Sequence, residues 1–144
     1  MLDDKADIGF RIKRLNDVMH ARANAVLSEY GLTFAQMKVL MFLKKRSGNR
    51  CLQKELEETF CVRHSTMTGI IKRLCAKGFA TSEVDRSDRR MRNIGLTEKG
   101  ANLAEQVDET HNAARKTLLR GFTEEQIRTL SGLLDAVYGN LTQS

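Results

Sequence analysis

The 144-residue sequence contains no proline and only three cysteines. Without proline nothing forces a helix to kink or stop, and a composition rich in Leu, Ala, Glu, Lys and Arg favours helix. The cysteines, Cys51, Cys61 and Cys75, form no CxxC pair, which argues against a disulfide scaffold and against a structural zinc site. We therefore predict a mainly α-helical protein with free thiols, no metal site and no cofactor.

Long apolar runs and enzyme motifs are also missing. No stretch reaches the roughly 18 to 20 consecutive apolar residues that a membrane span requires. The amino-terminal segment MLDDKADIGF is acidic and polar, unlike a secretion signal. HExxH, GxSxG, P-loop and GxGxxG patterns do not occur. We expect one soluble, cytoplasmic domain over residues 1–144 that binds no membrane and is not an enzyme.

Apolar residues at steps of three and four predict helices at both ends of the chain. One helix spans about residues 7–30, and the last begins near residue 123. A seam of a and d positions on that last helix packs either against the first helix of the same chain or against a second subunit, and we favour the second. We assign residues 5–30 and 97–142 to a helical dimerisation region. Its predicted contact residues are Ile8, Ile12, Leu15, Ile127, Leu130, Leu134, Val137 and Leu141.

Positive charge is concentrated in the middle of the chain. Residues 61–100 hold nine basic and four acidic residues, a net charge of +5, whereas residues 101–144 carry −2. Such a block is typical of a polyanion-binding face, although a solvated surface gives the same balance. Within it, residues 79–84 and 91–96 predict two short strands around a charged tip.

Two short helices precede this hairpin, and the second has contrasting faces. Met67, Ile71 and Leu74 share an apolar face with Ile70, while the opposite face carries small, hydroxylated or basic side chains. A polar helix after a tight turn is typical of a helix-turn-helix, in which it enters the major groove. The predicted DNA-binding residues of this helix and of the hairpin tip are Arg63, His64, Ser65, Thr66, Thr68, Gly69, Lys72, Arg73, Arg86, Asp88, Arg89, Arg90 and Arg92.

The hairpin tip adds to this prediction because four arginines fall within seven residues. An arginine on a protruding β wing reaches the minor groove, where narrow A·T-rich stretches concentrate negative potential. Asp88 is placed to orient a neighbouring arginine through a two-point hydrogen-bonded pair. A solvated turn whose charges pair among themselves is the alternative interpretation.

The segments STMTGIIKRLCAKGF and VDRSDRRMRNIGLTEKG resemble the MarR family of winged-helix regulators. Ser65, Thr66 and Thr68 match the family's recognition-helix positions, Asp88 and Arg90 its DxR wing motif, and Leu96, Thr97 and Gly100 its LTxxG motif. The resemblance implies a winged helix-turn-helix at residues 33–96, with a two-stranded wing. It also implies a homodimer that binds a pseudo-palindromic operator in double-stranded DNA. Glu57 and Cys61 depart from the pattern, which usually has a small residue and a glycine there.

Family members often respond to a small amphipathic or phenolic effector, so the resemblance also implies a repressor released by such a ligand. His20 and His111 are the candidate contacts in the effector cleft. Two alternatives stay open: a winged-helix module that binds a protein partner, and a regulator that senses oxidants through Cys61. A small buried turn residue is the simpler interpretation of Cys61.

Overall fold

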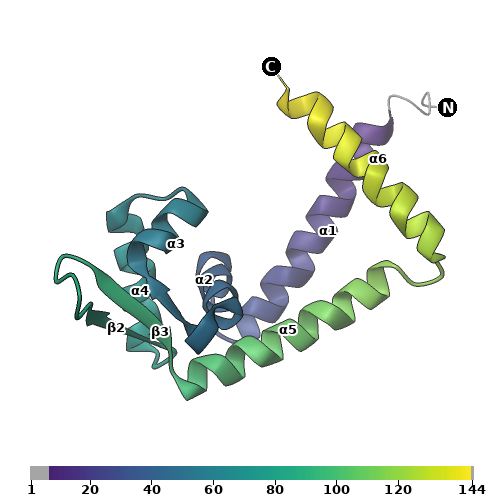
Figure 1. The fold of residues 1–144 in the computed structure, drawn as a ribbon. Helices are drawn as coiled ribbons and strands as arrows, with labels where there is room; N and C mark the ends of the chain where they lie inside the picture. Colours follow the sequence, from purple (N-terminus) through teal and green to yellow (C-terminus); the bar gives the residue numbers. More distant parts are fainter. Residues whose placement is uncertain (1–6, 144) are drawn as a thin grey trace. The chain divides into compact units, whose positions relative to one another are not determined.

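The computed structural model describes residues 7–143, so residues 5 and 6 of the predicted dimerisation region lie outside the described residues. The chain forms two compact units, one extending to Glu105 and the other starting at Gln106 (Figure 1). The first unit contains α1 (Asp7–Glu29), α2 (Phe34–Lys45), a 3-10 turn (Ser47–Asn49), β1 (Arg50–Leu52), α3 (Gln53–Phe60), α4 (His64–Ala76), β2 (Ala80–Val84) and β3 (Arg92–Leu96). Helix α5 (Glu98–Leu118) begins in the first unit and continues into the second, which also holds α6 (Glu124–Thr142).

Threonine side chains define the starts of several helices. Thr33 and Thr123 each accept a hydrogen bond from the backbone N–H three residues later, and the side-chain oxygen of the glutamine at that third position accepts one from the backbone N–H of the cap residue. Thr97 accepts from the N–H of Gly100 at 3.0 Å. Thr33, Thr97 and Thr123 therefore cap the helices that follow them.

A three-stranded antiparallel sheet in the order β1-β3-β2 forms the base of the wing. The predicted two-stranded wing is confirmed as β2 and β3, and β1 adds a third strand that the sequence did not predict. Cys51 of β1 lies opposite Ile94 of β3, and Ser82 of β2 faces Ile94 from the other side. The central strand β3 therefore joins the wing to the segment that leads into α3.

The core of the first unit lies between the helix-turn-helix and the sheet. The fully buried side chains are Val39, Leu40, Leu43, Leu56, Met67, Leu74 and Ile94. They come from α2, α3, α4 and β3, so burial of these side chains fixes how α4 is presented. Burial of each large apolar side chain contributes roughly 1.5–3 kcal/mol to stability.

Apolar side chains stay exposed on α1 and on α6. Ile8, Ile12 and Leu15 are exposed on α1, and on α6 Leu134 is 51% and Leu141 82% exposed. Exposed apolar surface on this scale marks an interaction site in most folded proteins. Within the described part of the chain, no helix has both the length and the apolar character that crossing a membrane requires.

Candidate nucleic-acid interface

The turn between α3 and α4 sets the angle of the second helix. Cys61 ends α3 with φ +50, in the left-handed region that favours glycine. This backbone explains why a glycine is the usual residue at the matching family position. The Cys61 side chain is exposed, so its interpretation as a small buried residue is wrong, because the turn faces solvent.

Helix α4 has the two faces that the sequence predicted. Met67, Ile71 and Leu74 are buried, and Ile70 is half-buried at the edge of the apolar face. The exposed residues on this helix and its cap are Arg63, His64, Ser65, Thr66, Thr68, Lys72 and Arg73, whereas Gly69 is half-buried. A Cβ added to Gly69 would meet only the end of the Arg73 side chain, at 4.0 Å.

Polar contacts join α3 to α4, and sequence reasoning missed them. Gln53 is buried, and its side-chain Nε2 donates to Thr68 Oγ1 at 2.9 Å. Glu57 Oε1 lies 2.6 Å from Nδ1 of His64. The unusual glutamate at position 57 was the available signal, because a charged side chain in the first helix of the motif needs a partner. Side chains of α3 thus hold two predicted DNA-binding residues, His64 and Thr68.

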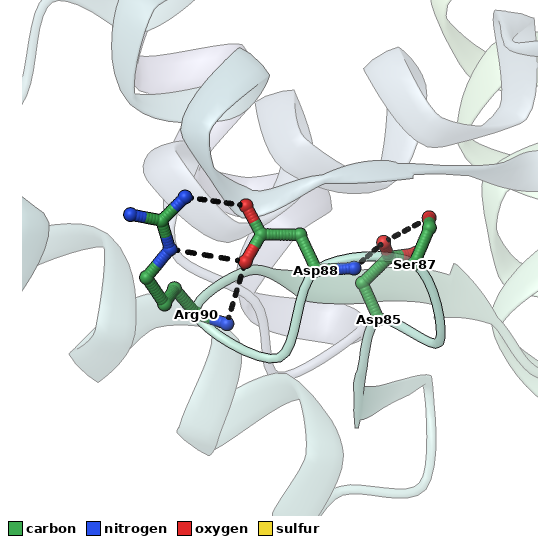
Figure 2. Close-up of polar contacts among 4 residues, drawn as sticks. All are labelled: Asp85, Ser87, Asp88 and Arg90. Carbon is green, nitrogen blue, oxygen red and sulfur yellow. Dashed lines mark hydrogen bonds and ion pairs between the residues drawn. The ribbon is translucent and has the colours of Figure 1, made fainter.

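Figure 2 shows the tip of the wing, where the Asp88 carboxylate is hydrogen-bonded to Arg90. One carboxylate oxygen of Asp88 accepts from the backbone N–H and Nε of Arg90 at 3.0 and 3.1 Å. The other carboxylate oxygen accepts from Nη2 at 3.1 Å. The predicted two-point pair is therefore present, while the Arg90 side chain remains 88% exposed. Arg90 is oriented without being covered.

Asp85 holds the turn behind this pair. Its carboxylate accepts from Ser87 Oγ at 2.7 Å and from the backbone N–H of Asp88 at 3.0 Å. It also accepts from the side-chain amide of Asn93. The Ser87 hydroxyl, followed by the Asp88 N–H, lowers the pKa of Asp85. The Arg90 guanidinium, followed by its N–H, lowers the pKa of Asp88, so both carboxylates are ionised at neutral pH.

The other predicted contact residues are placed differently. Arg86 and Arg89 are exposed at the tip, whereas Arg92 turns toward its own sheet and donates to Ser82 Oγ at 2.8 Å. A groove runs between α4 and the β2–β3 hairpin, lined among others by Thr68, Lys72 and Arg92. The predicted effector residues, His20 on α1 and His111 on α5, are both exposed.

Comparison with known proteins agrees with this geometry. A model of the MarR family matches residues 30–91, from the end of α1 to the wing. The transcriptional regulator PecS of Dickeya dadantii is 26% identical over 134 residues, covering 92% of this chain and 81% of PecS. The crystal structure of the transcriptional regulator SlyA is also 26% identical, with a TM-score of 0.73 and 94% of both chains covered. The chain is thus similar to MarR family regulators in sequence and in fold.

Other MarR-type proteins extend the comparison. YybA of Bacillus subtilis, an uncharacterised helix-turn-helix regulator, is 26% identical, and the match covers 98% of this chain and 90% of YybA. The Staphylococcus aureus MepR–DNA complex shares the fold, with a TM-score of 0.76 at 22% identity, and covers 92% of this chain and 96% of MepR. The proteins that this chain resembles along most of its length are helix-turn-helix transcriptional regulators.

Proposed function

We propose that this protein is a MarR-type homodimeric repressor that binds a pseudo-palindromic operator and is released by a small amphipathic effector. The observation that carries the proposal is the Asp88–Arg90 pair at the wing tip, beside the polar face of α4. Asp88 fixes the guanidinium through three hydrogen bonds, yet the side chain stays 88% exposed. Such a group is prepared for an external anion, because part of its conformational entropy is already lost before binding.

Helix α4 supplies the second half of the proposed interface. Its cap residue Arg63 makes no side-chain hydrogen bond to the first-turn N–H groups, and these groups carry the positive end of the helix dipole. Ser65 and Thr66 offer hydroxyls in the same turn, and Lys72 adds a charge two turns further on. We assign the first turns of α4 to the major groove and the wing tip to the minor groove or backbone.

A second copy of the chain is the partner that the apolar faces of α1 and α6 fit best. Leu134 and Leu141 lie on a seam spaced for helix packing, and both are exposed in a single chain. A dimer would present two winged modules to the two halves of an operator. The Staphylococcus aureus relative MepR was crystallised with DNA, which supports duplex DNA as the ligand. Release by an effector rests on the family alone.

Selection of genomic DNA fragments by the purified protein tests the proposal. Bound fragments should share a sequence with two inverted half-sites, and light scattering should give the mass of a dimer at micromolar concentration. With a fragment so identified, Arg90→Ala should weaken binding by about tenfold, which corresponds to about 1.4 kcal/mol. Arg115→Ala removes an exposed arginine from α5 and should leave the affinity unchanged. No enrichment of any duplex, or equal affinity of the two variants, contradicts the proposal.

A further inference from the structure

The contact between Glu57 and His64 joins the two helices of the helix-turn-helix at their polar edge. Glu57 lies on α3, and its side chain is only 17% exposed. His64 is the first residue of α4, and its side chain is 77% exposed. The separation between Nδ1 and Oε1 is 2.6 Å. One end of the imidazole is therefore held by a shielded carboxylate, while the rest of the ring faces solvent.

This contact determines where the ring carries its proton. An ionised carboxylate only accepts hydrogen bonds, so Nδ1 must be the donor. Gln53 Nε2 also lies 3.4 Å from Nδ1, but it donates to Thr68 at 2.9 Å, and the much shorter contact to Glu57 decides the position of the proton. In the neutral ring Nε2 is consequently a bare acceptor. It becomes a donor only when the ring takes up a second proton.

Charged and titratable groups lie around the ring. Glu57 of α3 forms its ion pair, and Arg63 precedes it at the helix cap. Four further titratable or charged residues line the same groove as His64, namely Lys72 and Cys75 of α4, Glu83 of β2 and Arg92 of β3. DNA phosphates and the N7 and O6 atoms of guanine are acceptors. In a neutral His64, Nε2 is an acceptor and cannot form a hydrogen bond with these acceptors of the DNA. In the protonated ring, Nε2 donates a hydrogen bond to them.

We propose that Glu57 positions His64 as a proton-dependent DNA contact, so that operator binding takes up a proton at Nε2 of His64. Two negative groups then act on the same ring, Glu57 on one side and the bound DNA on the other. The DNA offers its acceptors to the ring only in the complex, so the bound ring is the one that takes up the proton. Linkage therefore requires operator affinity to rise as the pH falls, because the complex holds one more proton than the free components. Glu57 is a positioning residue in this scheme, and His64 makes the contact.

Operator affinity measured between pH 6 and pH 8 at constant salt tests the proposal, which rests on the proposed DNA-binding function. The dissociation constant of the wild type should rise by about tenfold over this range, within the limit of tenfold per pH unit for one proton. His64→Gln should bind with a flat pH profile, close to the wild-type value at pH 8. Glu57→Gln should weaken this dependence, since it removes the acceptor that holds Nδ1 of the ring.

The other two histidines of the chain provide matched controls. His20→Gln and His111→Gln change exposed rings on α1 and α5 and should leave the pH profile as it is. A flat profile in the wild type, or a slope that survives in His64→Gln, would overturn the inference while DNA binding itself still stood. Failure to bind at every pH would instead contradict the proposed function.

A measurement without DNA tests the positioning step separately. Nitrogen–proton correlation spectra of the free protein above neutral pH should show the His64 ring protonated at Nδ1. In Glu57→Gln that preference should weaken, because an amide offers either an acceptor or a donor to the ring. A His64 ring protonated at Nε2 in the wild type would refute the assignment whatever the DNA titrations give.

Discussion

Replacing Gly100 with alanine should disturb the joint between the wing and α5. Gly100 is buried in the first turn of α5. A Cβ at this position would overlap the carbonyl oxygen of Phe79 and lie 2.8 Å from its carbonyl carbon. Both are backbone atoms, so no side chain can rotate away to relieve the clash. The start of α5 or the segment leading into β2 would have to move by more than 1 Å to reach ordinary contact distance.

The cost can be estimated from the interactions at this joint. Overpacking against fixed atoms costs about 1–3 kcal/mol, and a backbone clash belongs at the upper end. The same carbonyl of Phe79 accepts the N–H of Thr97 at 3.1 Å, and losing this bond adds about 1 kcal/mol. Alanine recovers about 1 kcal/mol through its higher helix propensity. We therefore expect Gly100→Ala to lower the free energy of unfolding by about 3 kcal/mol.

Urea unfolding followed by circular dichroism, at equal protomer concentration, measures this loss, which should also appear as a melting temperature lower by about 10 °C. Gly69→Ala is the matched control, because its new Cβ has space on α4. It should raise stability by about 1 kcal/mol. If both variants were stabilised alike, α5 would not approach Phe79 as closely as the structure requires.

Three further predictions concern DNA binding, the wing and the dimer. Lys72→Ala should reduce the slope of log affinity against log salt by about 0.9 if it removes one phosphate contact; an unchanged slope excludes that role. Because Arg90 lowers the pKa of Asp88, their ion pair should be intact above the ordinary aspartate value of about 3.9 and be lost as the pH falls through the lowered value. The Arg90 Nε resonance, followed from pH 7 to pH 2, should report that loss, and a midpoint above pH 4 would disagree. Leu134→Lys, which places a charge in the α6 seam, should convert the dimer to monomer at micromolar concentration in light scattering, and a persistent dimer would remove Leu134 from the interface.

Local signals in the sequence predicted much of the fold. Thr33 caps α2 through neighbours in its own first turn, and Asp88 reaches Arg90 only two residues away. Such contacts depend on short-range spacing, which a sequence displays directly. The apolar face of α4 was equally visible, because Met67, Ile71 and Leu74 recur with the helical period.

Contacts between distant residues could not be predicted in the same way. Strand β1 has only three residues and exists because Cys51 pairs with Ile94 in β3. Gln53 lies fifteen residues from Thr68, and the two meet only after α3 and α4 have packed. The Glu57–His64 contact likewise depends on the left-handed turn at Cys61. These features follow from tertiary packing, for which a single sequence carries no period or motif.

The central position of β3 makes the base of the wing rigid. Asn93 is paired with β1 on one side and with β2 on the other, so bending the hairpin at its base would break hydrogen bonds in two ladders at once. Only the segment beyond Val84 and Arg92 lies outside the ladder. The wing is therefore rigid at its base, and only the few residues at its tip can adjust to grooves of different width.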